Sequence, residues 1–219
     1  MQTNDLSLFH IVNEPKFNSG KAPLLIMLHG YGSNEEDLFS FAEELPEEFF
    51  IISVRAPFKM QPYGNAWYNI YWNNTGGKFS DDKQAIASRD QIAVFIDEAV
   101  AAYPVDKDNV TLVGFSQGTI LSLAVALSYP EKVKNVVALS GYINIEILKE
   151  NYKENDFSRL AVYSSHGNSD PVIPVAWARK TKPFLDALGI ENSFSEFPVG
   201  HGVAPQNLLE VKNWLNKQV

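Results

Sequence analysis

The segment Gly114-Phe115-Ser116-Gln117-Gly118 places a serine between two glycines, in the pattern G-x-S-x-G. The residues before Ser116 are typical of a buried strand, and the residues after it are typical of a helix. A sharp turn from strand to helix lifts the serine oxygen clear of a sheet, and small neighbours leave room for both elements. The pattern and its context therefore predict a nucleophilic serine for acyl transfer.

A serine hydroxyl is a weak nucleophile and needs a base, for which the chain offers four histidines. They are His10, His29, His166 and His201. His10 falls inside an expected first strand, whereas His29 and His166 each end a strand and are expected near the rim of a site. His201 lies in a glycine-flanked loop after the last expected strand, which is where this topology would deliver a base. We therefore predict that His201 is the base.

The carboxylate that orients this base is predicted to be Asp170, just past the end of an apolar strand. Asp156 and Asp186 also lie between Ser116 and His201, but in a charged segment and a helix body, where solvated carboxylates are expected. The three chosen residues each follow a different strand, in the chain order serine, aspartate, histidine. Such a triad predicts acyl transfer with a histidine base and an orienting aspartate.

The backbone N–H groups of Tyr31 and Gln117 are the predicted donors to a developing oxyanion. Tyr31 lies in the segment LHGYGSNEEDL, directly after an apolar strand, and Gln117 opens the helix after the serine. Gly30 and Gly32 allow close approach of this backbone. They also make the turn into a helix expected near Asn34, and the two interpretations coexist.

Short apolar segments alternate with helical patterns along the chain, which predicts an α/β fold with a mostly parallel sheet covered on both faces. Sites in such sheets form beyond the carboxyl ends of the strands. Strands are expected at 6–12, 24–28, 49–54, 110–115, 133–140, 160–165 and 193–197, and helices at 34–44, 86–103, 117–128, 175–188 and 207–217. A long aromatic loop is expected up to about residue 84, and an irregular charged segment at 143–157.

Length and composition predict one globular domain over residues 1–219. The net charge of -8 disfavours nucleic acid as a partner, because phosphate groups would be repelled. The chain has no cysteine, which excludes disulfides and thiolate metal sites and fits a cytoplasmic location. We expect no signal peptide and no stable membrane insertion, because the apolar runs are short. A metal site is not expected, because His29 and His166 lack a recognisable ligand pattern.

The motifs together resemble the phospholipase/carboxylesterase family of α/β-hydrolases, which includes bacterial carboxylesterases and acyl-protein thioesterases. The resemblance covers nearly the whole chain and rests on LHGYG (28–32), AWY (66–68), GFSQG (114–118), LSGY (139–142), HGNSDPVIP (166–174) and GHGV (200–203). It implies a single domain with a sheet of about seven or eight strands, a minimal lid, no cofactor, and a triad of Ser116, Asp170 and His201. Tyr31 and Gln117 fall at the oxyanion positions.

Two positions depart from the pattern of the family. Ser33 stands where many members have aspartate, so different hydrogen bonding is expected in that turn. Tyr31 stands where leucine is frequent, so activity on long-chain thioesters is not carried over to this chain.

The stretch PYGNAWYNIYWNNTGG (62–77) is rich in tyrosine and tryptophan. The resemblance implies that Trp67 and Tyr68 lie near the site, where they would wall an acyl or alcohol pocket. The alternatives are that the rings cover a sheet edge or pack a long loop that must be anchored somewhere, or that the loop forms a homodimer contact.

The sequence thus predicts a serine carboxylesterase for small to medium acyl esters. A thioesterase, lysophospholipase or peptidase with the same triad is the alternative. A non-catalytic binding module on the same fold is disfavoured, because no member of the triad is missing.

Overall fold

The computed structural model describes residues 5–16, 20–72 and 78–219 of the chain. Its described part contains a seven-stranded sheet with the spatial order β1-β3-β2-β8-β9-β10-β11. The strands are β1 (His10–Asn13), β2 (Ala22–Leu28), β3 (Phe50–Val54), β8 (Val105–Phe115), β9 (Asn135–Leu139), β10 (Ala161–Gly167) and β11 (Glu191–Phe197). Only the edge strand β1 runs antiparallel to its neighbour within this sheet. The predicted α/β fold with a mostly parallel sheet is confirmed.

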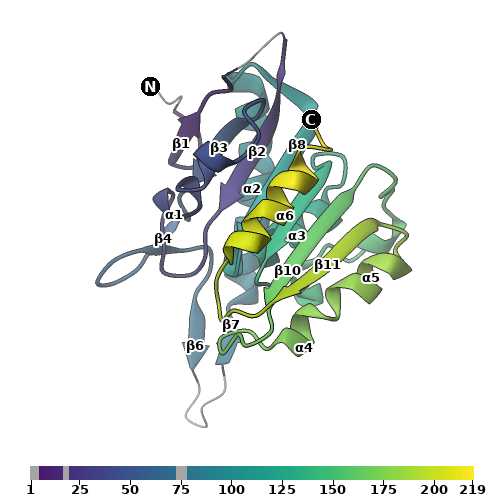
Figure 1. Ribbon diagram of the computed structural model, residues 1–219. Helices are drawn as coiled ribbons and strands as arrows, with labels where there is room; N and C mark the ends of the chain where they lie inside the picture. Colours follow the sequence, from purple (N-terminus) through teal and green to yellow (C-terminus); the bar gives the residue numbers. More distant parts are fainter. Residues whose placement is uncertain (1–4, 17–19, 73–77) are drawn as a thin grey trace.

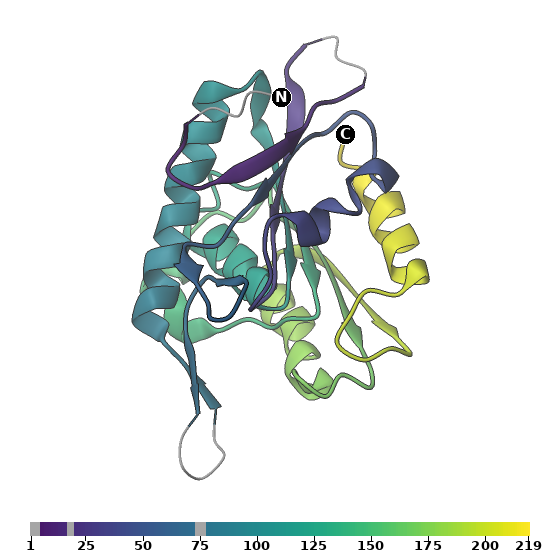
Figure 2. The same ribbon diagram turned by 90° about the vertical axis from the view of Figure 1, so that its left-hand side faces the viewer.

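Helices cover both faces of the sheet (Figures 1 and 2). They are α1 (Glu36–Phe39), α2 (Asp82–Ala102), α3 (Gln117–Ser128), α4 (Val175–Ala178), α5 (Thr181–Ala187) and α6 (Pro205–Leu215). The strand β2 shows why both faces must be covered. Its side chains at 24, 26 and 28 belong to a core cluster that includes residues of α2, α3 and α5, whereas those at 25 and 27 belong to a cluster that includes residues of α1 and α6. Side chains alternate between the two faces of a strand, so a continuously apolar strand needs a cover on each face.

Two predicted helices are broken into shorter pieces. The helix expected at 34–44 is α1 followed by the 3-10 helix η1 (Ala42–Glu44). Between them the Ser40 hydroxyl donates to the Asp37 carbonyl oxygen, a local bond that competes with helical pairing. The helix expected at 175–188 is α4 followed by α5, because Pro183 has no N–H to continue the ladder across Arg179.

The long loop expected between β3 and α2 contains two small hairpins. In the first, β4 (Phe58–Lys59) pairs with β5 (Asn65–Ala66); in the second, β6 (Ile70–Trp72) pairs with β7 (Lys78–Ser80). The second hairpin projects from the body of the molecule (Figures 1 and 2). Strands of two or three residues are too short to show an alternating pattern, which is why the sequence did not predict them. Residues 73–77 of the aromatic stretch lie outside the described residues.

The segment expected to be irregular contains the short 3-10 helices η2 (Ile145–Ile147) and η3 (Tyr152–Glu154). No helix of the described residues is long and apolar enough to cross a membrane.

Candidate active site

Ser116 occupies the corner between β8 and α3. Its backbone has φ 54° and ψ -113°, in the region that L-residues rarely adopt. The Ser116 N–H donates to the Leu139 carbonyl oxygen at 2.9 Å, which ties the corner to the end of the neighbouring strand β9. The strained backbone is thus held by the sheet itself.

The two glycines around Ser116 are needed for contact between backbones. A Cβ added to Gly114 would lie 2.5 Å from the Gly118 carbonyl group, and one added to Gly118 would lie 1.9 Å from the Leu28 carbonyl oxygen. Neither contact leaves room for a side chain. The glycines therefore let α3 begin directly against the ends of β8 and β2.

Three side chains from separate loops form one hydrogen-bonded chain. The Ser116 Oγ lies 2.9 Å from His201 Nε2, and His201 Nδ1 lies 2.6 Å from Asp170 Oδ2. These residues follow the carboxyl ends of β8, β11 and β10, as the topology requires. In the resting arrangement His201 Nδ1–H donates to the carboxylate, and the serine hydroxyl donates to Nε2.

The Asp170 carboxylate is fully buried and accepts three hydrogen bonds, two of which come from backbone N–H groups. Its Oδ1 accepts from Val172 N at 2.8 Å and from Ile173 N at 3.0 Å. Burial alone would raise the pKa of Asp170, but hydrogen bonds from His201 and from the two N–H groups outweigh it and lower this pKa. The group is therefore an anion at neutral pH.

The loops that carry Asp170 and His201 meet at another close approach of backbones. A Cβ added to Gly167 would lie 2.1 Å from the Gly200 carbonyl oxygen. The His201 ring also packs against the Phe115 ring, with centroids 5.0 Å apart. These contacts fix where the imidazole stands relative to Ser116.

The backbone N–H groups of Tyr31 and Gln117 have no hydrogen-bond partner within the described part of the chain. Both lie beside the serine, because the added Cβ of Gly30 would be 3.5 Å from Ser116 Cβ and Gln117 is the next residue. Two unpaired donors beside a nucleophile can bind an oxyanion.

A model of the phospholipase/carboxylesterase family matches residues 11–219. The chain belongs to this family. Among curated relatives, a probable carboxylesterase (SOBER1-like) of Arabidopsis thaliana is 27% identical over 66% of this chain and 55% of its own length. Acyl-protein thioesterase 1 of Saccharomyces cerevisiae is 29% identical over 70% of this chain and 69% of its own. The match therefore spans only about half of the plant relative.

Solved structures agree with the fold of this phospholipase/carboxylesterase family member. The Bacillus cereus carboxylesterase has a TM-score of 0.82 at 22% identity, covering 97% of this chain and 95% of its own. Esterase PE8 has a TM-score of 0.83 at 24% identity, covering 98% and 100%. At identities of 22% and 24%, these likenesses show the shared α/β-hydrolase fold alone.

The side chain of Gln117 holds the aromatic stretch against the nucleophile corner. Its Oε1 accepts from Trp67 N at 2.8 Å, and its Nε2 donates to the Tyr68 carbonyl oxygen at 2.8 Å. Trp67 also donates its ring N–H to the His29 carbonyl oxygen at 3.0 Å. The sequence did not predict this role, because a glutamine in G-x-S-x-G gives no sign of what its amide binds.

Trp67 and Tyr68 do lie beside the site, but they are only 0% and 2% exposed and belong to the main core. Burial also raises the pKa of Tyr68 above its ordinary value, which keeps the phenol neutral. Side chains without accessible surface favour the packing alternative over a pocket wall. Two other aromatic side chains near the triad keep accessible surface, the half-buried Tyr142 and the exposed Trp177, whose rings meet edge to face at 5.2 Å. The motif LSGY (139–142) includes Tyr142, whereas no motif singled out Trp177.

The turn at Ser33 is held by two hydrogen bonds. The Ser33 hydroxyl donates to Asp37 Oδ2 at 2.7 Å, and its carbonyl oxygen accepts from Asn65 N at 2.7 Å. The turn that carries Tyr31 is therefore held from α1 and from the first hairpin.

The other histidines have separate places in the fold. His10 is buried and bonds the Tyr103 hydroxyl through Nε2 at 2.6 Å, so it belongs to the core. His29 is fully buried, with Nδ1–H donating to the Gly30 carbonyl oxygen and Nε2 accepting from Ala56 N. Both nitrogens of His29 are thus used in the neutral form, and burial lowers its pKa. His166 is buried beside Asp170, with its Nε2 3.2 Å from Asp170 Oδ2.

His29 should make the protein less stable in mild acid. A histidine whose folded pKa lies below its ordinary 6.5 binds fewer protons than in the unfolded chain. The contribution of His29 to the free energy of unfolding is therefore complete at pH values above its pKa in the unfolded chain. It is lost as the pH falls from there toward its pKa in the folded protein. We expect the free energy of unfolding to fall with a slope of up to about 1.4 kcal/mol per pH unit.

The measurement is urea unfolding between about pH 5.5 and about pH 7.5. His29→Gln, whose Oε1 can still accept from Ala56 N, should be less stable at neutral pH but should show a flatter pH dependence. An equally steep dependence in that variant would assign the effect to other groups.

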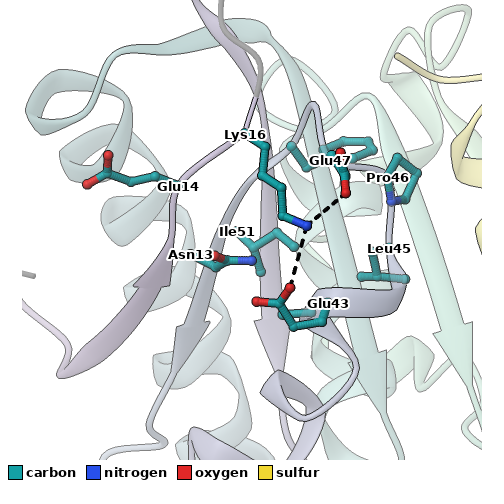
Figure 3. A pocket seen from close by; sticks show the side chains of 10 residues that line it. Asn13, Glu14, Lys16, Glu43, Leu45, Pro46, Glu47 and Ile51 are labelled. Carbon is teal, nitrogen blue, oxygen red and sulfur yellow. Dashed lines mark hydrogen bonds and ion pairs between the residues drawn. The ribbon is translucent and has the colours of Figure 1, made fainter.

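A shallow pocket lined by Lys16, Glu43 and Glu47 lies near the start of β3, at the edge of the sheet opposite the triad (Figure 3). The Lys16 ammonium is 2.7 Å from Glu47 and 3.7 Å from Glu43. The described residues contain no group of three or more His, Cys, Asp or Glu side chains placed to hold a metal ion.

Proposed function

We propose that this chain is a serine carboxylesterase that hydrolyses small to medium acyl esters through an acyl-enzyme intermediate. The observation that carries the proposal is the hydrogen-bonded chain from Ser116 through His201 to Asp170 at the carboxyl edge of the sheet. Membership of the phospholipase/carboxylesterase family supports the same reaction class.

In the first half-reaction the Ser116 Oγ attacks the ester carbonyl carbon, and His201 Nε2 takes the hydroxyl proton. The buried Asp170 carboxylate stabilises the imidazolium that forms. The carbonyl oxygen becomes an oxyanion, which accepts hydrogen bonds from the N–H groups of Tyr31 and Gln117. The intermediate then collapses, His201 returns the proton to the departing alcohol, and the acyl group stays on Ser116.

In the second half-reaction a water molecule takes the place of the alcohol. His201 removes its proton while the water oxygen attacks the acyl carbon, and the same N–H pair stabilises the second oxyanion. Collapse of this intermediate releases the carboxylic acid and returns the proton to Ser116.

Trp177 and Tyr142 are the side chains that we assign to acyl binding. Tyr142 follows Gly141, whose added Cβ would lie 3.1 Å from the Ser116 carbonyl oxygen, and Trp177 follows the Asp170 loop on α4. Trp177 is 49% exposed although its side chain is large and apolar, and Val172 on the Asp170 loop is 48% exposed. Such surface beside a nucleophile supports contact with an acyl chain.

A panel of p-nitrophenyl esters from acetate to palmitate tests this assignment. We expect the highest kcat/KM for short and medium chains. Trp177→Ala should lower kcat/KM for octanoate by about tenfold and leave acetate nearly unchanged, because only the longer chain reaches the indole. Leu209→Ala, which removes an exposed side chain on α6, is the matched control. An equal loss for both esters would contradict an acyl-binding role.

A thioesterase is the second candidate, because the yeast relative is named acyl-protein thioesterase 1. Thioesters of the same acyl chains, compared by kcat/KM with the esters, separate the two activities. A peptidase would instead cleave amide substrates. Labelling of Ser116 by a fluorophosphonate separates all three from a binding module, which would leave the serine unmodified.

We also propose a domain organisation, a location and an oligomeric contact for this protein. All seven main strands share one sheet, which supports a single domain over 1–219. The absence of cysteine favours the cytoplasm. The exposed Tyr71 and Phe79 on the second hairpin are the surface we assign to a homodimer contact, which sedimentation would test.

A further inference from the structure

His166 is a buried imidazole that the proposed reaction does not use. It lies near the end of β10, is 1% exposed, and precedes Asp170 by four residues. Its place in the sequence predicted only that it would lie near the rim of the site.

The protonation of His166 follows from its contacts. Nε2 lies 2.8 Å from the Ile173 carbonyl oxygen and 3.2 Å from Asp170 Oδ2. Both of these atoms are acceptors, so the proton must be on Nε2. Nδ1 is buried and has no hydrogen-bond partner in the described residues. These contacts therefore place an N–H group on the side of the ring that faces Asp170.

The same carboxylate oxygen serves two imidazoles. Asp170 Oδ2 accepts from His201 Nδ1 at 2.6 Å and faces His166 Nε2 at 3.2 Å. An N–H group that faces this oxygen from 3.2 Å draws part of its negative charge away from the bond to His201 and restricts the direction of the oxygen. His166 also holds the Ile173 carbonyl group, while the Ile173 N–H binds the other oxygen of Asp170.

Few charged groups share the surroundings of His166. Glu196 lies opposite it on β11 and is itself paired with Arg179, at the end of α4, at 2.7 Å. Glu210 of α6 is bonded to Tyr163, on the other face of β10. Asp170 is therefore the carboxylate through which a change at His166 would be felt.

We propose that His166 is a positioning residue that acts through Asp170, orienting the carboxylate and moderating its pull on His201. This inference rests on the proposed esterase function. Donors that orient such a carboxylate set the proton affinity of the base and thereby the rate of proton transfer. Substrate binding is not involved, so the effect should appear in kcat.

Two amide variants test the role. His166→Gln can place an amide N–H where Nε2–H was, whereas His166→Asn is one methylene shorter and cannot reach Asp170. We expect kcat of the Gln variant within about threefold of the parent, and kcat of the Asn variant about tenfold or more lower, with KM within about twofold. The acidic limb of the rate profile should move about half a pH unit upward in the Asn variant, because the carboxylate then acts on His201 alone.

A measurement without turnover keeps this inference separate from the esterase proposal. The downfield proton NMR resonance of His201 Nδ1–H, followed against pH in the free protein, should move in the Asn variant and return in the Gln variant. If neither the parent nor any variant hydrolyses esters, the esterase proposal fails while this titration still tests His166. Equal behaviour of folded Asn and Gln variants, in rate or in resonance, would overturn the positioning role.

Discussion

Ser116→Ala is expected to lower kcat for p-nitrophenyl butyrate by about 10⁴-fold to 10⁶-fold. The variant removes the oxygen that carries the acyl group in the proposed reaction, together with the hydroxyl proton that His201 takes. The remaining rate would come from the oxyanion donors and a water molecule at His201. Initial rates in the steady state, together with the loss of a burst of p-nitrophenol, measure the effect.

Ser122→Ala is the matched control for this variant. Ser122 lies on α3, which begins directly after Ser116, is also buried, and its hydroxyl donates to the Gly118 carbonyl oxygen. We expect nearly full activity from it and nearly unchanged thermal unfolding from both variants. Hydrolysis by Ser116→Ala at a rate close to that of the parent would remove the serine from the mechanism.

Gly118→Ala is expected to lower the free energy of unfolding by about 3–5 kcal/mol, or to prevent folding. Its Cβ would lie 1.9 Å from the Leu28 carbonyl oxygen and 2.8 Å from that of His29. Both atoms are backbone at the end of the central strand β2, so neither can rotate away. Relief requires α3 to separate from β2, which would open the core and displace the N–H group of Gln117.

Gly20→Ala is the control for this substitution, because its added Cβ would meet nothing within 4 Å. Urea unfolding followed by circular dichroism compares the two, and the control should stay within about 0.5 kcal/mol of the parent. A Gly118→Ala protein of parental stability would mean that α3 does not begin against β2 as described.

The sequence predicted the central sheet because its strands are short, continuously apolar and bounded by polar segments. It predicted α3 with its observed bounds, since the change of pattern at Ser116 is abrupt. It also predicted which loops carry Ser116, Asp170 and His201, and the structure brings these side chains within hydrogen-bond distance. Their catalytic roles stay predictions that the variants test.

Other features depend on contacts that no local pattern carries. Residues 34–44 have a helical composition, yet the bond from the Ser40 hydroxyl to the Asp37 carbonyl oxygen ends the helix early. The rings of Trp67 and Tyr68 could equally wall a pocket or fill a core, and only their burial decides between these roles. The N–H group that faces Asp170 from His166 was unpredictable because it depends on the orientation of the His166 ring.

Residue 117 joins two parts of the protein with two of its own groups. Its backbone N–H lies at the serine, and its side-chain amide holds the backbone of Trp67 and Tyr68, some fifty residues earlier in the chain. A Gln117→Ala variant would therefore keep the N–H but release that segment, so a loss of rate would report a displaced loop rather than a missing donor. Gln117 thus links the catalytic corner to the hairpin region. Substitutions in that region can alter substrate specificity only while the side-chain amide of Gln117 keeps these two hydrogen bonds.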